Sequence, residues 1–182
     1  GGFRNTPGTA LKNDQTGEVV YIPPQTGAEV IAHMTALEKF INGDEYKHLD
    51  ALVRMAIIHH QFESIHPFPD GNGRLGRIIN VLYLTQQRLL DIPILYLSRY
   101  ITANKADYYR LLQSVRDTGE WEPWLLYMLT AVAETAARTI DLVADIRTLM
   151  ADYKQSIRSE HGKIYSQDLL NNLFRHPYTR ID

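Results

Sequence analysis

Residues 65–77 read Ile-His-Pro-Phe-Pro-Asp-Gly-Asn-Gly-Arg-Leu-Gly-Arg, and this stretch decides the fold because it places a short polar loop between two apolar helices. Before it, apolar residues recur every three or four positions, which predicts one buried helical face: Leu52, Met55, Ile58, Phe62 and Ile65. Pro67 ends this helix, since a residue that precedes proline is disfavoured in the α region. We therefore expect His66 on a loop at the helix exit, where its imidazole can accept a proton near neutral pH.

The second half of this stretch has the features of an anion site. Gly71-Asn72-Gly73 tolerates positive φ, so its backbone N–H groups can converge on an anion at the start of the next helix. Arg74 and Arg77 lie in the first turn of that helix, where cations are unfavourable by about 0.3–1 kcal/mol each unless an anion lies among them. Asp70 is the nearby acid, and a carboxylate beside phosphates is a typical Mg²⁺ ligand. The pattern predicts phosphoryl chemistry, with His66 as the base.

Residues 66–77 match the signature His-Pro-Phe-x-Asp-Gly-Asn-Gly-Arg-x-x-Arg of the Fic domain family at every fixed position, and the resemblance extends from about residue 3 to about residue 150. The enzymes of this family move AMP from ATP onto a protein hydroxyl. The resemblance implies that His66 is the general base for that hydroxyl and that Asp70 holds Mg²⁺ against the α- and β-phosphates. It also implies that Phe68 is a buried anchor of the loop.

The resemblance assigns the nucleotide contacts as well. Gly71, Asn72 and Gly73 are expected to bind phosphate oxygens, and Arg74 and Arg77 are expected to reach the β- and γ-phosphates. Doc-type relatives, which orient the nucleotide differently, depart from the signature at the position of Gly73. The resemblance therefore favours AMP transfer over kinase activity.

A β-hairpin is expected at about residues 10–24. After Gly17, β-branched and aromatic residues predict a strand that two prolines end: Val19, Val20, Tyr21 and Ile22. The strand either covers the edge of the core or, as the resemblance implies, is a flap to whose exposed edge a target segment adds as a further strand. Both interpretations stay open at this stage.

Several helices are expected around the loop. Thr26 and Glu29 form a capping-box pattern that starts a helix. Residues 91–98 read as an extended connector, and a helix is expected from about residue 102 to residue 116, with Gly119 closing it. Within that helix, Tyr108 and Tyr109 either pack in the core or, as the resemblance implies, contact the adenosine.

The helix before the loop also carries a pattern typical of a different site, a metal centre. His59, Glu63 and His66 lie at positions i, i+4 and i+7, and two histidines with a carboxylate can hold iron or zinc. Pro67 breaks the helix where the third ligand would need it, and a metal site alone leaves the two arginines of the loop unexplained. Phosphoryl chemistry is therefore the preferred hypothesis.

The C-terminal part is expected to be helical. A helix from Trp121 toward Gly162 carries apolar residues at alternating three- and four-residue steps, a seam that could cover a subdomain or a second copy in a homodimer. Residues 166–174 look like another helix, which resembles the opening of a helix-turn-helix or winged-helix module. The string Ser-Ile-Arg-Ser-Glu-His at 156–161 departs at its last position from the inhibitory motif of many Fic proteins, so chance similarity in a charged helix is the preferred interpretation, and an inhibitory helix outside this chain stays an open alternative.

Length and composition limit the remaining choices. The chain has 182 residues, 45% of them hydrophobic, with a net charge of −2 and no cysteine, which predicts one main domain without disulfides, a nucleic-acid partner or a membrane span. We expect a cytoplasmic protein whose given sequence is a piece of a longer one. Residues 1–150 are expected to form a Fic-type all-α bundle that includes the small hairpin, and residues 151–182 a helical extension.

The predicted function is transfer of AMP from Mg-ATP to a Ser, Thr or Tyr hydroxyl of a target protein, with self-modification also open. The alternatives are an enzyme of the same fold that uses another nucleotide donor or removes AMP, and a non-catalytic nucleotide-binding module. Fold and signature together do not decide among these.

Overall fold

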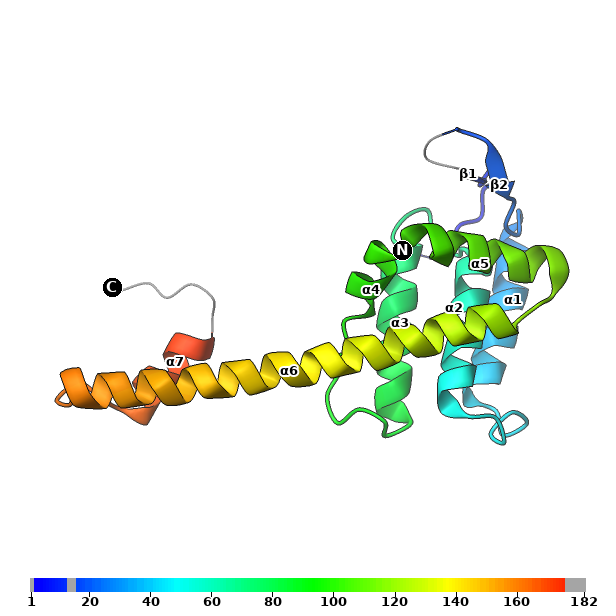
Figure 1. The fold of residues 1–182 in the computed structure, drawn as a ribbon. Helices are drawn as coiled ribbons and strands as arrows, with labels where there is room; N and C mark the ends of the chain where they lie inside the picture. The colour runs from blue at the N-terminus through cyan, green and yellow to red at the C-terminus, as the bar shows by residue number, and fades with distance from the viewer. Residues whose placement is uncertain (1, 13–15, 176–182) are drawn as a thin grey trace. The chain divides into compact units, whose positions relative to one another are not determined.

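The computed structural model describes residues 2–12 and 16–175, which form seven helices and one two-stranded antiparallel hairpin (Figure 1). The elements are β1 (Leu11–Lys12), β2 (Val19–Tyr21), α1 (Gly27–Asn42), α2 (Ala51–Ile65), α3 (Asn72–Gln86), α4 (Leu97–Ala103), α5 (Lys105–Thr118), α6 (Glu122–Glu160) and α7 (Gln167–Arg175). The expected helical fold with a small hairpin is confirmed. Among the described residues, no helix combines the length and apolar composition that a membrane span needs.

The chain divides into two compact units, Gly1–Thr135 and Ala136–Asp182. Helix α6 contributes residues to both units and continues unbroken past residue 150, where the sequence suggested a domain boundary. That boundary stays a prediction. The first unit contains the loop of residues 66–71, and the two units are described separately below.

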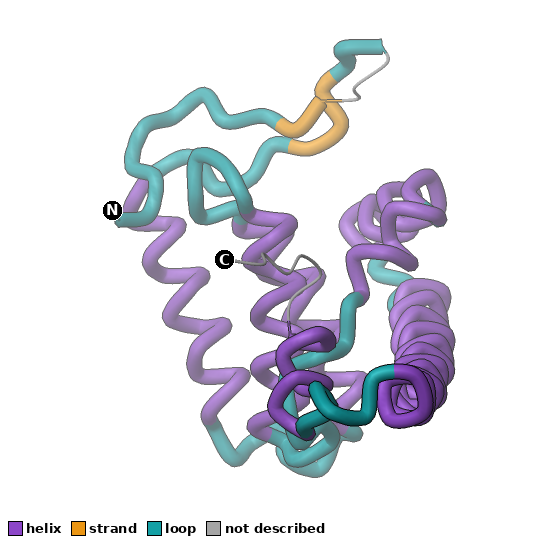
Figure 2. The backbone as a smooth tube through the Cα atoms, turned by 90° about the vertical axis from the view of Figure 1, so that its left-hand side faces the viewer, coloured by secondary structure: helices purple, strands orange, loops and turns teal. Residues whose placement is uncertain are grey.

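In the first unit, α2 lies between α1 and α3, and Figures 1 and 2 show the three helices side by side. Because it has neighbours on both sides, α2 is buried along most of its length, including its polar residues Arg54, His59, His60 and Glu63. Trp124 at the start of α6 is fully buried and donates from Nε1 to the Ala56 carbonyl at 3.0 Å, which attaches α6 to α2. The loop after α2 and the hairpin lie at the same end of this bundle (Figure 1).

The predicted capping box starts α1. The Thr26 hydroxyl accepts from the Glu29 N–H at 3.2 Å, and the Glu29 carboxylate accepts from the Thr26 N–H at 2.9 Å. At the other end of α1, Arg54 donates to the carbonyls of Phe40 and Ile41 at 2.8 and 3.0 Å. The N–H groups at the start of α1 are thus bonded by local side chains, and the carbonyl groups at its end are bonded by the side chain of another helix.

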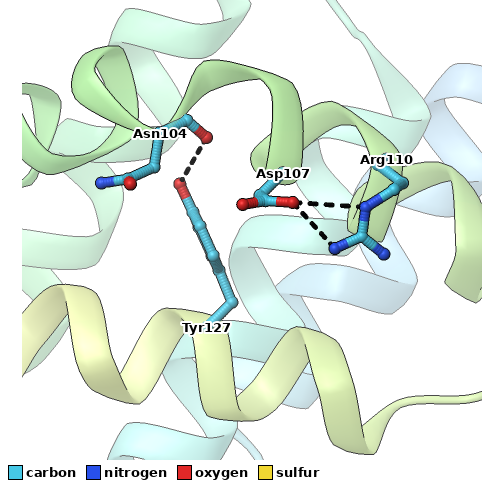
Figure 3. A network of polar contacts seen from close by, with 4 residues as sticks. All are labelled: Asn104, Asp107, Arg110 and Tyr127. Atoms are coloured by element: carbon cyan, nitrogen blue, oxygen red, sulfur yellow. Dashed lines mark hydrogen bonds and ion pairs between the residues drawn. The ribbon is translucent and has the colours of Figure 1, made fainter.

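The expected single helix at residues 102–116 is wrong in its start, because two helices, α4 and α5, meet at Asn104. Asn104 interrupts the helix: its amide side chain bonds the Tyr100 carbonyl at 3.0 Å, and its own carbonyl accepts from the Tyr127 hydroxyl at 3.4 Å. Figure 3 shows Tyr127 reaching this junction from α6, next to the Asp107–Arg110 ion pair of α5. The connector is correspondingly shorter than predicted, since α4 already begins at Leu97.

The hairpin pairs Leu11 with Tyr21 and Lys12 with Val19, with an irregular register between the two residues of β1. β2 ends at Tyr21, so Ile22 lies just outside the strand that the sequence predicted. The Arg116 guanidinium of α5 lies over the Tyr21 ring, 3.8 Å from its centroid. This contact attaches the hairpin to the helical bundle, while Val19 and Val20 remain about half exposed, at 52% and 45%.

In the second unit, α6 and α7 pack through Tyr153 and Phe174, whose ring centroids are 5.6 Å apart. The helix predicted at Ser166 is confirmed, since the Ser166 hydroxyl accepts from the Leu169 N–H at 3.0 Å and α7 follows. Large apolar side chains of α6 in this unit stay exposed: Ile140, Leu142, Val143, Ile146, Leu149 and Tyr153.

Candidate active site

The loop between α2 and α3 begins with His66 in the left-handed region, at φ 49° and ψ 58°. Its N–H still bonds the Phe62 carbonyl at 3.0 Å, so His66 is the cap of α2 rather than part of a free loop. Gly71 then adopts φ 82° as the cap of α3, a conformation that glycine reaches without strain. Two left-handed residues therefore determine where the chain leaves one helix and enters the next.

Arg4, which no pattern in the sequence indicates, holds the main chain at the start of the loop. Its guanidinium donates to the carbonyls of Ile65 and His66 at 3.1 and 2.7 Å, and its main-chain N–H donates to the Pro67 carbonyl at 2.9 Å. The Arg4 side chain is buried, with 5% of the residue exposed. An isolated arginine in a polar N-terminal stretch carries no sequence pattern that would have revealed this role.

Asn72 fixes the middle of the loop through its side chain. Its amide donates to the Phe68 carbonyl at 2.7 Å and accepts from the Phe68 N–H at 2.9 Å. The Phe68 ring packs between Phe3 and Phe62, at centroid distances of 5.5 and 6.5 Å. The Asn72 side chain thus shapes the loop, and only the main chain of Asn72 is left for the expected contact with phosphate.

Glycines let α3 approach α2 closely. A Cβ at Gly76 would lie 2.9 Å from Oε1 of Glu63 and 3.2 Å from the His59 ring. A Cβ at Gly73 would lie 3.2 Å from Nη1 of Arg77. Glu63 is buried between these groups, and burial raises its pKa to about 7 although the charges of Arg77 and Arg116 lower it.

The surroundings of His66 favour a neutral imidazole. Burial is the largest cause that lowers the pKa of His66; the Glu63 carbonyl raises it, and the charges of Arg4 and Arg116 lower it further. Arg116 is held nearby by its Nε–H bond to the Ser64 hydroxyl at 3.0 Å. A neutral imidazole can act as a base, so the electrostatics suit the role that the sequence suggests.

The far end of the loop is open. Nη2 of Arg74 lies 3.5 Å from Oδ2 of Asp70, and both side chains are exposed, at 73% and 94%. Nε of Arg77 is buried and has no hydrogen-bond partner in the part of the chain that the structure describes. These groups and the N-terminus of α3 form a cradle of cationic and N–H groups, and the exposed Asp70 carboxylate at its edge is the kind of donor that Mg²⁺ takes next to phosphates. The donor set therefore fits Mg²⁺ and a polyphosphate.

The rival metal site is excluded by its geometry. Nε2 of His59 lies 2.9 Å from the Tyr108 hydroxyl and Nδ1 lies 3.0 Å from the Asn80 amide nitrogen, so both ring nitrogens are hydrogen-bonded. Burial lowers the pKa of His59 to about 4, as expected for a neutral core histidine. No group of three or more His, Asp or Glu side chains within residues 2–12 and 16–175 is placed to hold a metal ion.

The two tyrosines of α5 occupy different environments. Tyr108 is buried, with 3% exposed, and its hydroxyl is bonded to His59. Tyr109 is 54% exposed, and Nζ of Lys105 lies 5.6 Å from its ring centroid. Adenosine contact stays a prediction for both residues, and exposure favours Tyr109.

The chain is similar in sequence to known proteins. Residues 1–84 match the model of the Fic/DOC family, and residues 149–182 match the C-terminal domain of SoFic-like protein adenylyltransferases. A probable protein adenylyltransferase of Aquifex aeolicus is 44% identical over 57 residues, which are 31% of this chain and 18% of that protein. Protein adenylyltransferase fic-1 of Caenorhabditis briggsae is 29% identical over 112 residues, 62% of this chain and 20% of the relative. The chain thus spans about a fifth of the length of these curated relatives.

Solved structures share the fold. The crystal structure of a Fic family protein from Desulfovibrio desulfuricans aligns with a TM-score of 0.66 at 26% identity, over 78% of this chain and 41% of that one. Fic-1 from Caenorhabditis elegans aligns with a TM-score of 0.54 at 21% identity, over 79% of this chain and 38% of that one, a likeness of fold alone. The chain therefore carries a Fic/DOC family domain, followed by a C-terminal region of the SoFic-like type.

Proposed function

We propose that this chain is a protein adenylyltransferase that moves AMP from Mg-ATP to a Ser, Thr or Tyr hydroxyl of a protein. The observation that carries the proposal is the position of His66, a half-buried imidazole that caps α2 at the start of a loop whose other end is an anion cradle. A base next to a polyphosphate site is the arrangement that nucleotidyl transfer requires.

In the proposed reaction, His66 takes the proton of the acceptor hydroxyl. The hydroxyl oxygen forms a bond to the α-phosphorus, the bond from that phosphorus to the bridging oxygen of the β-phosphate breaks, and pyrophosphate leaves. Because burial and two nearby guanidinium groups lower the pKa of His66, the imidazole is neutral and able to accept the proton at neutral pH. The proton is later lost to solvent.

The cradle residues hold and orient the nucleotide in this proposal. Arg74, Arg77 and the N–H groups at the start of α3 bind phosphate oxygens, as guanidinium forks and helix N-termini do. Asp70 would hold Mg²⁺, which when bound neutralises phosphate charge. The exposed Tyr109 is the better placed of the two α5 tyrosines to stack on the adenine.

The hairpin is proposed to bind the target. Val19 and Val20 are about half exposed on β2, and an exposed strand can receive a further strand from an extended peptide. The Arg116 guanidinium lies over the Tyr21 ring, a contact that would fix the hairpin relative to His66. The acceptor hydroxyl belongs to a second protein or to this chain itself.

The test is transfer of label from ATP labelled at the α- or the γ-phosphate, with Mg²⁺, for the chain alone and with cell lysate. We expect transfer from the α-position only, and His66→Ala should lose about 10²- to 10⁴-fold in rate while keeping its fold. His33→Ala, at an exposed histidine of α1, is the matched control and should keep the parent rate.

Two results would contradict the proposal. Transfer from the γ-phosphate would indicate a kinase. Binding of ATP without any transfer, by the parent and by His66→Ala alike, would indicate a nucleotide-binding module.

A further inference from the structure

Arg4 makes three hydrogen bonds to three consecutive carbonyls of the active-site loop. Nη2 donates to the Ile65 carbonyl at 3.1 Å, Nε donates to the His66 carbonyl at 2.7 Å, and the main-chain N–H donates to the Pro67 carbonyl at 2.9 Å. The partners are about sixty residues away in sequence, and Arg4 is 5% exposed. Because Arg4 is buried and its hydrogen bonds go to the loop, its role is to hold the loop.

The end of α2 needs such a partner. The last carbonyls of a helix have no N–H group within the helix to bond, and the residue after His66 is a proline, which has no N–H to offer. The helix end also carries about half a negative charge, which a guanidinium group complements. Arg4 meets both needs at once.

The conformation of His66 is a second reason why the contact from Arg4 is needed. At φ 49° it occupies the left-handed region, which is strained for a residue with a side chain, so the surrounding contacts must hold it there. The bond from Arg4 to its carbonyl and the bond from its own N–H to Phe62 restrain the two sides of this residue. The direction of the imidazole follows from this backbone conformation.

We propose that Arg4 is a positioning residue: it holds the main chain of residues 65–67, keeps His66 left-handed, and so aims the imidazole at the acceptor hydroxyl. This inference rests on the function proposed above for His66. Arg4 itself touches neither the substrate nor the nucleotide in this proposal. Its guanidinium fork matters as well as its charge, because Nε and Nη2 bond different carbonyls.

Two variants separate the fork from the charge. Arg4→Lys keeps the charge but lacks the planar guanidinium that bonds two carbonyls. Arg4→Gln removes the charge as well. We expect kcat for AMP transfer to fall about 10- to 100-fold in Arg4→Lys and further in Arg4→Gln, because a misplaced base loses its alignment. The Kd for Mg-ATP should stay within about twofold in both variants, since the cradle is untouched. Arg99→Lys, at an exposed arginine of α4, is the matched control.

A purely structural role predicts something else. It would lower the melting temperature of the variants while leaving kcat and its pH profile as in the parent at temperatures where they are folded. That result would overturn the proposal.

The NMR titration of the His66 ring tests the proposal without any assay of activity. The charge of Arg4 lowers the pKa of His66, after the larger effect of burial, so Arg4→Gln should raise the measured pKa and shift the ring resonances. Arg4→Lys should change the resonances through geometry. If the parent transferred no AMP, this measurement would still show whether Arg4 positions His66, so the two proposals fail separately.

Hydrogen exchange provides a test that needs no variant. The His66 N–H, bonded to Phe62, should exchange as slowly as amides inside α2 if Arg4 clamps this helix end. Exchange as fast as that of the Asp70 N–H, in an exposed residue of the loop, would overturn the proposal, even if both Arg4 variants fail to fold.

Discussion

The two ends of the active-site loop are built in opposite ways. At the His66 end, the main chain is bonded to Arg4 and Phe62, and the next turn is bonded to the Asn72 amide. At the Asp70 end, the side chains of Asp70 and Arg74 are exposed and contact each other at 3.5 Å. The protein thus holds the main chain at the His66 end through its own hydrogen bonds, whereas the side chains at the Asp70 end are exposed.

This difference indicates how the site divides its work. A base must be aligned before the substrate arrives, because loose alignment of a reacting group costs rate. Ligands of a metal ion and of phosphates can be ordered by the anion that they bind. If this division is right, changes at the Asp70 end should affect activity and leave stability alone, whereas changes at the His66 end should affect both.

At the Asp70 end, the largest effect is expected for Asp70→Ala. The carboxylate is the proposed Mg²⁺ ligand, and metal-ion catalysis supplies several kcal/mol, so transfer should fall by about 10²- to 10³-fold. Because the side chain is 94% exposed, the free energy of unfolding should change by less than about 0.5 kcal/mol. Mg²⁺-dependent kinetics and urea unfolding measure the two quantities, and a large loss of stability would contradict the division.

The next largest effect is expected on the pH dependence of the free energy of unfolding, through the buried His59 of α2. Burial lowers the pKa of His59 from its ordinary value of 6.5 to about 4, so the folded state keeps it neutral while the unfolded chain takes up the proton. Its contribution is fully present above pH 6.5 and is lost as the pH falls toward 4, which amounts to roughly 3 kcal/mol.

Urea unfolding between pH 7 and pH 4 measures this sensitivity. His59→Gln should be less stable than the parent at pH 7 but should lose less stability on acidification. Burial also lowers the pKa of His60 to about 4, which adds to this loss, whereas the pKa of Glu63, raised to about 7, opposes it as the pH falls from 7. The matched control is His33→Gln at an exposed position, which should keep the slope of the parent; equal slopes in all three proteins would refute the assignment.

A smaller effect is expected for Asn72→Ala. The change leaves the N–H and the carbonyl of Phe68 without their partners, which should lower the free energy of unfolding by about 1–3 kcal/mol. Activity should fall too, since the loop between His66 and the cradle loses its shape. Asp70→Ala, two residues away, is the matched control, and a variant of Asn72 as stable as that control would show that the loop is not held by these bonds.

The sequence predicted much of this, for identifiable reasons. Periodic apolar residues, the Thr26–Glu29 cap and Pro67 act locally, so the helices and the loop could be placed. The break at Asn104 was missed because its support comes from Tyr127, on another helix. Arg4 and Arg116 were missed for the same reason: their partners, Ile65, His66, Ser64 and Tyr21, are distant in sequence.

The smallest effect is expected for Arg74→Gln. The exposed pair with Asp70 is worth about 0–1 kcal/mol, and the N-terminus of α3 repels the guanidinium by a similar amount, so the two nearly cancel. Without nucleotide, the free energy of unfolding should therefore change by less than about 0.5 kcal/mol in urea, and 0.5 M salt should change the difference little.

Adding Mg-ATP should separate the parent from Arg74→Gln. An anion in the cradle turns the repulsion between Arg74 and the helix end into attraction, so ligand binding should raise the melting temperature of the parent more than that of the variant. Arg99→Gln, at an exposed arginine outside the cradle, should respond as the parent does. Equal stabilisation of all three proteins by Mg-ATP would mean that Arg74 does not bind the nucleotide, and that the Asp70 end of the loop is open for some other reason.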